Sequence, residues 1–211
     1  MSLGTWYDET ILPRIIGVGC GTPEVAALRQ QVVPLARGAV FEIGCGGGYN
    51  QPLYDRAAVT SFAGIDPNGA LLEAERGRAE ANGWAAEIRQ GVGEAIPFGD
   101  ASFDTVVCTY TLCSVNDPAK VLSEMRRVLK PGGTLLYLEH GKAPDAAQQK
   151  WQRRIEPVWK KLMGNCHLTR EVGAAIAPAG FVIEPVGQDY FDGVPKWAGW
   201  MEWGVARKSG E

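Results

Sequence analysis

Three alternating glycines and a later aspartate carry the clearest chemical signal in this chain. Gly44, Gly46 and Gly48 follow an apolar run that begins at Ala39. Residues without a Cβ let a backbone turn sharply and approach a ligand closely. Asp66 ends a second apolar segment about 20 residues further on, the spacing at which a carboxylate can accept the hydroxyls of a ribose. The pattern predicts a nucleoside cofactor, against the simpler alternatives of a plain strand-to-helix turn and a helix-capping Asp66.

A sheet must position these residues, and the chain alternates short apolar runs with amphipathic helical patterns, which is typical of α/β folds. The run at 103–109 is apolar almost throughout, as a parallel strand buried on both faces requires. A helix is expected directly after the glycines, with Asn50 in its first turn. The other expected elements are strands at 39–43, 61–66, 86–91, 134–139, 181–190 and 197–207, and helices at 68–82, 117–130, 145–163 and 169–179.

The glycine segment reads Glu-x-Gly-x-Gly-x-Gly from Glu42 onward. This pattern resembles motif I of the class I S-adenosylmethionine-dependent methyltransferases, with Glu42 as its acidic residue and Asp66 as the ribose-binding acid. Three further segments resemble that family in the same order. They are the adenine-holding loop at 93–98, the fourth strand at 102–107 and the turn into the fifth strand at 129–135, so that the matches cover roughly residues 38–140.

The resemblance implies one methyltransferase domain over 1–211 with a Rossmann-like, doubly wound α/β fold. Its sheet would be mostly parallel and seven-stranded, closed by an antiparallel C-terminal hairpin. Residues 1–37 would form a helical lid, 38–140 the cofactor-binding core, and 141–211 the substrate-insert helices and the hairpin. The cofactor would be S-adenosyl-L-methionine, with S-adenosyl-L-homocysteine as its product.

The same motifs imply which residues contact the cofactor. Many relatives carry an aspartate at the position of Val92, and its absence here implies main-chain contact to the adenine from Gly93 and Glu94. The full set of expected contacts is Glu42, Gly44, Cys45, Gly46, Asn50, Asp66, Pro67, Gly93, Glu94 and Thr109.

Composition narrows the class of partner. The 21 basic and 24 acidic side chains leave a net charge of -3, which gives no general attraction to nucleic acid or anionic membranes. The five cysteines are odd in number and lack a C-x-x-C pair, which suits a reducing cytosol.

No segment reaches the roughly 18 apolar residues of a membrane span, and no signal-peptide pattern opens the chain. We expect a cytoplasmic protein with a small-molecule acceptor, no nucleic acid, no integral membrane anchor and no metal. The oligomeric state stays open.

Particular strings, at 107–115, 138–140, 151–152, 156–159 and 165–171, narrow the resemblance. They are similar to methyltransferase-like proteins whose animal members are membrane-associated alkyl thiol S-methyltransferases, although this chain lacks the hydrophobic anchor of those enzymes. The resemblance implies a small, fairly apolar acceptor, with a thiol as the first choice. The alternatives are a C- or O-methyltransferase of the quinone-biosynthesis type, a phospholipid N-methyltransferase and a non-catalytic cofactor-binding sensor.

Methyl transfer from a sulfonium needs a dry, well-aligned site more than it needs a strong base. A thiol with a pKa of about 8.5 is already partly ionised near neutral pH. His140 is the candidate catalytic base, with orientation of the cofactor or a loop as the alternative. His167 beside Cys166 is the one hint of zinc, but no further Cys/His cluster accompanies it. The acceptor pocket is expected to include Tyr7, Cys113, Trp151, Tyr190, Trp197 and Trp200.

Overall fold

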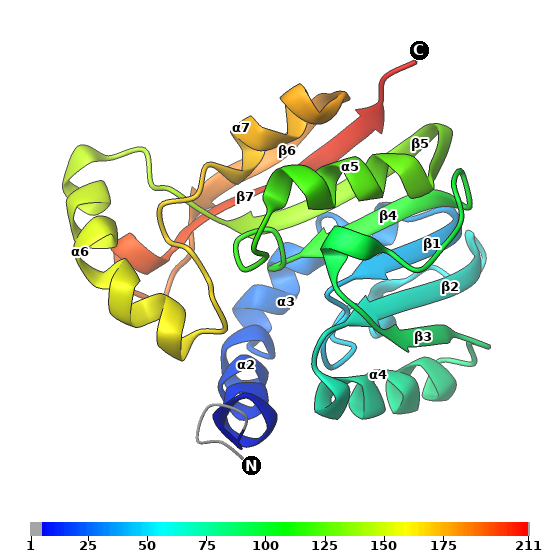
Figure 1. Cartoon of the computed structure of the whole chain (residues 1–211), viewed down its shortest axis with the longest axis horizontal. Coiled ribbons are helices and arrows are strands. Elements are labelled where there is room, and N and C mark those ends of the chain that lie inside the picture. The colour runs from blue at the N-terminus through cyan, green and yellow to red at the C-terminus, as the bar shows by residue number, and fades with distance from the viewer. Residues whose placement is uncertain (1–5, 211) are drawn as a thin grey trace.

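The computed structural model describes residues 6–210, so residues 1–5 of the predicted lid, and Glu211, lie outside the described residues. Within 6–210, seven strands form one sheet in the order β3-β2-β1-β4-β5-β7-β6 (Figure 1). Strands β1 to β5 are parallel, whereas β7 pairs antiparallel with both β5 and β6. The predicted fold class is confirmed. The strands are β1 (Gly38–Ile43), β2 (Val59–Asp66), β3 (Glu87–Gln90), β4 (Phe103–Thr109), β5 (Leu129–His140), β6 (Phe181–Tyr190) and β7 (Trp200–Lys208).

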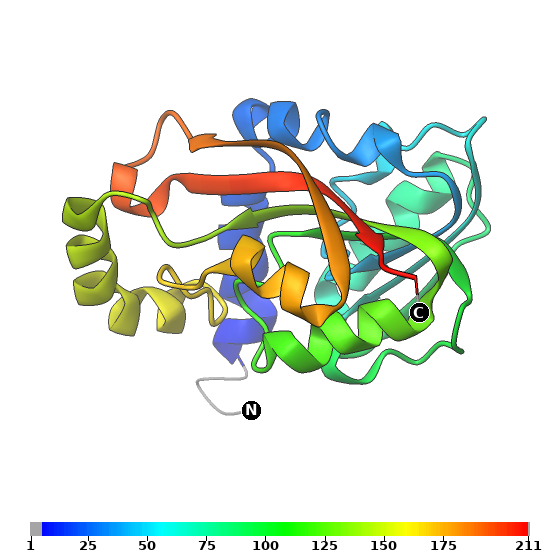
Figure 2. The same cartoon turned by 90° about the horizontal axis from the view of Figure 1, so that it is seen from above.

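Helices cover both faces of the sheet, with α5 and α7 on one side and α3 on the other (Figure 2). Neighbouring strand residues such as Val40 and Phe41 point to opposite faces and enter separate cores. The α-helices are α2 (Leu12–Cys20), α3 (Pro23–Arg29), α4 (Gly69–Ala81), α5 (Pro118–Val128), α6 (Ala146–Leu162) and α7 (Val172–Ile176). Shorter turns are η1 (Tyr7–Ile11), η2 (Val33–Leu35), η3 (Gln51–Leu53), η4 (Gly93–Ala95), η5 (Ala177–Ala179) and η6 (Lys196–Ala198).

Two helices at the carboxyl edge of the sheet, α4 and α5, begin at residues with side-chain caps. The side-chain oxygen of Asn68 accepts the Ala70 amide at the start of α4, at 3.0 Å. Asp117 accepts the Lys120 amide in the same way at the start of α5, also at 3.0 Å. Such caps satisfy amides that have no partner inside the helix. They fix where each loop at this edge ends.

The segment between β1 and β2 differs from the prediction. It forms the single 3-10 turn η3 rather than an α-helix with Asn50 in its first turn. Pro52 lacks the amide that a helix would use. The side chains of Asn50 and Gln51 turn inward and donate to the buried carboxylates of Glu42 and Glu75. These inward hydrogen bonds replace a helical continuation.

Three other boundaries also differ. β5 begins at Leu129, which pairs with Phe103, so the preceding helix ends at Val128 instead of continuing to residue 130. The helix expected at 169–179 shortens to α7 followed by η5, in which Pro178 interrupts the helical hydrogen bonds. The last strand begins at Trp200, because residues 196–198 form η6.

Candidate active site

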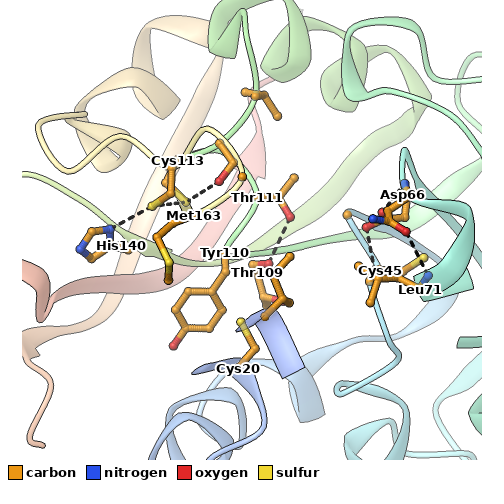
Figure 3. Close-up of a pocket in the computed structure, with 18 of the residues that line it drawn as sticks. Cys20, Cys45, Asp66, Leu71, Thr109, Tyr110, Thr111, Cys113, His140 and Met163 are labelled. Atoms are coloured by element: carbon orange, nitrogen blue, oxygen red, sulfur yellow. Dashed lines mark hydrogen bonds between the residues drawn. The ribbon is translucent and has the colours of Figure 1, made fainter. Parts of the chain in front are cut away.

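A cavity of about 470 Å³ opens at the carboxyl ends of the parallel strands. Its volume is within the range of small-ligand pockets, and this edge is where open α/β sheets bind ligands. Figure 3 shows Cys45 and Asp66 toward one end and Cys113 and His140 toward the other. We call the part formed by residues 44–47 with Asp66 the glycine end. The part formed by Cys113, His140, Met163 and Cys166 is the sulfur end.

Every residue predicted to contact the cofactor lines this cavity. The ends of β1, β2 and β4, with the loops that follow β1 and β3, bring together residues that are up to 67 positions apart in the chain. The lining residues that the sequence predicted are Glu42, Gly44, Cys45, Gly46, Asn50, Asp66, Pro67, Gly93, Glu94 and Thr109.

The three glycines of the turn have different roles. Gly44, Gly46 and Gly48 all have positive φ, at 64°, 53° and 79°. A Cβ at Gly44 would collide with the Thr111 side chain, and one at Gly48 would collide with the Glu75 carboxylate. A Cβ at Gly46 would meet nothing closer than 3.9 Å. Two glycines therefore allow the turn to pack tightly, and Gly46 leaves free space inside the cavity.

Asp66 ties the end of β2 to the glycine turn. Its Oδ2 accepts the Gly46 amide at 3.0 Å, and its Oδ1 accepts the Asn68 amide at 2.8 Å. Burial raises the pKa of Asp66, and these two amide contacts oppose the rise. Asn68 is the residue that caps α4, so capping does not account for Asp66. Each oxygen of a carboxylate has two acceptor sites, so both can still receive a hydrogen bond from a ligand.

Glu42 lies beneath the turn, where protein donors already occupy both of its oxygens. Oε1 accepts from Asn50 Nδ2 at 2.8 Å, and Oε2 accepts from the Tyr54 hydroxyl at 2.6 Å. Asn50 also donates to Thr109 Oγ1 at 3.0 Å, which links β1 to β4. Burial, reinforced by the charge of Glu75, raises the pKa of Glu42 well above its usual range. Glu42 thus positions the turn and Asn50 in addition to lining the cavity.

The predicted adenine loop is held by its own contacts. A Cβ on Gly93 would lie 2.6 Å from Ile43 Cδ1, so only glycine lets η4 pack this closely on β1. Glu94 Oε1 accepts the amides of Asn116 and Asp117 at 2.9 and 3.1 Å. Val92 is 48% exposed. Gly93, which has no side chain, and Glu94, whose carboxylate is engaged by these amides, both line the cavity.

A buried glutamate organises the opposite wall. Glu139, fully buried at the end of β5, accepts the amides of Thr111, Leu112 and Cys113 at 2.9 to 3.1 Å. Burial raises the pKa of Glu139, and the amide contacts oppose that rise. The same loop holds Tyr110 at a φ of 55°, a left-handed conformation that is unusual for a residue other than glycine. Glu139 therefore fixes the position of Cys113.

The sulfur end brings together groups that are distant in the sequence. The Sγ atoms of Cys113 and Cys166 are 3.7 Å apart, and Cys166 Sγ lies 3.5 Å from His140 Nδ1. His140 is 5% exposed, and its Nε2 has no hydrogen-bond partner among residues 6–210. The Cys113 thiol and the His140 ring lower the pKa of Cys166 well below its ordinary value. The hydrogen bond to Cys166 and burial raise the pKa of Cys113.

The structure places the aromatic residues of the predicted acceptor pocket outside the lining of this cavity. Of the six residues named, Cys113 lines the cavity, but the aromatic side chains of five do not. Trp151 points outward and is 52% exposed. Trp197 packs edge-on against Trp159, and Tyr190 packs against Trp200, so these rings stabilise the hairpin and α6. Tyr7 donates its hydroxyl to the Leu162 carbonyl at 2.7 Å.

The cavity wall around the sulfur end comes from elements whose faces the sequence does not specify. Leu12, Ile15 and Ile16 of α2 line the cavity, and Leu12 lies beside Gly164, which follows α6. The remaining wall residues missed by sequence reasoning include Met163, Cys166, Phe191 and Met201. All four fall in the region 141–211 expected to form the substrate insert and hairpin, and the string at 165–171 includes Cys166.

The described part of the chain holds neither a cluster of metal ligands nor a single helix long and apolar enough to cross a membrane. Among residues 6–210, no three His, Cys, Asp or Glu side chains are grouped to hold a metal ion. No single helix there has the length and apolar character of a membrane span, although the bent pair Glu9–Cys20 and Pro23–Leu35 passes that test when taken together.

Sequence comparison supplies a family for this fold. Residues 41–137 match the model of a methyltransferase domain. The thiol S-methyltransferase TMT1B of Rattus norvegicus is 38% identical over 144 residues, which cover 67% of this chain and 59% of that protein. The human thiol S-methyltransferase TMT1A is 31% identical over 161 residues, 73% of this chain and 64% of that protein. A phosphatidylethanolamine N-methyltransferase of Cereibacter sphaeroides is 38% identical over 125 residues, 56% and 60% respectively. The chain thus spans less than two thirds of each of these relatives.

Solved structures agree on the fold. An S-adenosylmethionine-dependent methyltransferase of Thermotoga maritima, a possible histamine N-methyltransferase, superposes with a TM-score of 0.67 at 20% identity, covering 99% of this chain and 100% of that chain. The [4+2]-cyclase SpnF has a TM-score of 0.69 at 17% identity, covering 99% and 96%. At these identities the likeness establishes the fold and leaves the reaction open.

Fold, cavity and sequence match together place this chain in the class I S-adenosylmethionine-dependent methyltransferases. S-adenosylmethionine is the cofactor of that family. Within that family, the chain is similar in sequence to thiol S-methyltransferases of mammals.

Gly46→Val tests the glycine end. The side chain would enter the free space at Gly46, so S-adenosylhomocysteine should no longer raise the melting temperature of the variant. Gly77→Ala is the matched control, because a Cβ there meets nothing within 4 Å and lies on exposed α4. Equal stabilisation of the parent and Gly46→Val by S-adenosylhomocysteine in thermal melts would contradict this assignment.

Glu75 predicts a pH dependence of stability. Burial raises its pKa to about 7 from an ordinary 4.5, so the folded protein holds a proton that the unfolded chain has released between these values. The free energy of unfolding therefore falls as pH rises through this window. Glu75→Gln removes the cost of burying an ionised carboxylate. The variant should be more stable than the parent by roughly 1 to 3 kcal/mol at high pH, with no gain below about pH 4. Urea unfolding at both extremes measures this, and a gain independent of pH would refute it.

Proposed function

We propose that this protein transfers the methyl group of S-adenosylmethionine to the sulfur of a small, fairly apolar thiol. The observation that carries the proposal is the continuity of one cavity from the glycine turn to a cluster of Cys113, Cys166 and His140. The thiol S-methyltransferases among the relatives support the same acceptor.

The glycine end fits the cofactor. The space beside Gly46 is open, and both oxygens of Asp66 keep acceptor capacity that suits the two ribose hydroxyls. The backbone of Gly93 and Glu94 would hold the adenine, as expected from the absence of an acid at position 92. The cofactor, when bound, supplies a methyl group on a positively charged sulfur.

The sulfur end fits a thiol acceptor. Met163, Phe191 and Met201 line the cavity and favour an apolar acceptor while excluding water. The Nε2 of buried His140, which has no partner among residues 6–210, is available to orient the acceptor or to receive its proton. In a poorly hydrated site, the reaction of a thiolate with a sulfonium removes two opposite charges, and a strong base is unnecessary.

Product analysis tests the reaction class. The protein should convert isotopically labelled S-adenosylmethionine and a small alkyl or aryl thiol to the labelled thioether and S-adenosylhomocysteine. Quinols, phenols and phosphatidylethanolamine, offered in parallel, should gain little label. Label on carbon, oxygen or nitrogen of those acceptors, with none on thiols, would reject the proposal in favour of the quinone or phospholipid enzyme classes.

The pH dependence of methyl transfer should report the acceptor itself. Across a series of thiols of increasing acidity, the pH at which the rate reaches half its maximum should follow each thiol's own pKa, because the thiolate is the nucleophile. Initial rates at saturating cofactor measure this. A midpoint that stays fixed while the acidity of the thiol changes would contradict a pre-ionised acceptor.

His140→Ala should lower the rate of thiol methylation only modestly, well short of the roughly 10² to 10⁴-fold loss expected for a true general base. His167→Ala is the matched control, because His167 interacts with Glu156 at 3.4 Å and does not line the cavity. A collapse of activity in His140→Ala alone would identify His140 as the base and favour a hydroxyl acceptor.

A further inference from the structure

Two thiols meet at the sulfur end of the cavity although 53 positions separate them in the chain. Cys113 follows β4, and Cys166 follows α6. The backbone amide of His167 donates to the Cys113 carbonyl at 2.9 Å, which holds the two loops together. The Sγ atoms are 3.7 Å apart. A disulfide needs about 2 Å between these atoms, so its formation requires the side chains and the adjoining loops to move closer by the difference.

The other three cysteines differ from this pair. Cys108 is fully buried in β4 and hydrogen-bonds to Glu139. Cys45 lies at the glycine end, and Cys20 lies on α2. Burial raises the pKa of each of these three thiols. Cys166 alone has a thiol partner and the His140 ring beside its sulfur within the described residues, an environment that favours the reactive thiolate.

We propose that Cys113 and Cys166 form a peroxide-sensitive dithiol, whose oxidation to an intramolecular disulfide closes the sulfur end of the cavity. Cys166 thiolate attacks one oxygen of hydrogen peroxide, the O–O bond breaks, and hydroxide leaves as water after taking a proton. Cys113 sulfur then attacks the resulting Cys166 sulfenic acid, its proton goes to the departing oxygen, and a second water leaves. The two thiols lose two electrons, and the peroxide gains them.

The two ends of the cavity should respond differently. Bond formation moves the sulfur atoms together and removes the partner of His140 Nδ1, so the wall that would receive the acceptor changes shape. The glycine turn follows β1, and Asp66 ends β2. The hydrogen bonds of Asp66 go to the amides of Gly46 and Asn68 and do not involve Cys113 or Cys166. Oxidation should therefore abolish methyl transfer and leave cofactor binding in place.

Thiol counting and peptide mapping test the disulfide directly. One equivalent of hydrogen peroxide should lower the free thiols of the denatured protein from five to three, and mapping without reductant should recover one peptide pair joined through Cys113 and Cys166. In Cys113→Ser, the sulfenic acid should persist on Cys166 and be trapped by dimedone. Cys20→Ser, which removes a different cavity thiol, should still form the bond. Retention of five thiols, or a bond between other cysteines, would overturn the proposal.

The turnover measurements rest on the proposed thiol methyltransferase activity, whereas the thiol count does not. Peroxide should abolish turnover of the parent, dithiothreitol should restore it, and calorimetry should find unchanged affinity for S-adenosylhomocysteine in the oxidised protein. If the disulfide forms and turnover persists, closure of the acceptor site is wrong. If neither oxidised nor reduced protein methylates a thiol, the proposed function fails while the disulfide assignment stands on its mapping.

Discussion

A buried carboxylate must find hydrogen-bond donors or give up its charge, and this constraint shapes the carboxyl edge of the sheet. Glu139 gathers three amides of the loop that follows β4. Asp66 gathers the amides of Gly46 and Asn68. Glu42 takes the side chains of Asn50 and Tyr54. Each acid lies at or beside the end of a parallel strand. The loops around the cavity are therefore held by the same interaction, a hydrogen bond to a buried carboxylate.

The cavity held in this way has two unlike ends. The glycine end offers backbone and carboxylate groups, which suit the polar nucleoside of the family's cofactor. The sulfur end offers thiols, thioethers and a single imidazole nitrogen without a partner among the described residues. A reaction that joins a cationic methyl donor to a soft nucleophile would place the donor at the first end and the acceptor at the second. The proposed dithiol lies at the second end, where its closure would affect the acceptor alone.

The part of the site that is local in sequence could be predicted. The glycines follow β1 and Asp66 ends β2, and these two strands pair in parallel, so the spacing in the sequence brings them together. The meeting of Cys113 with Cys166 could not be predicted, because it depends on how the loop after α6 folds back. Trp151 and Trp159 lie eight residues apart on α6, or about 80° around the helix, so the helical spacing leaves open which of them faces the cavity. The sequence pattern does not fix that rotation, and the structure turns Trp159 inward.

Binding of S-adenosylhomocysteine to the parent and to Asp66→Ala, measured by titration calorimetry, tests the central assignment most directly. Thermal unfolding followed by circular dichroism establishes that the variant is folded. We expect the parent to bind S-adenosylhomocysteine at one site. Asp66→Ala should still unfold cooperatively but show no measurable binding, because charge-assisted contacts to the ribose are lost. Unchanged affinity in Asp66→Ala would contradict the placement of the cofactor at the glycine end.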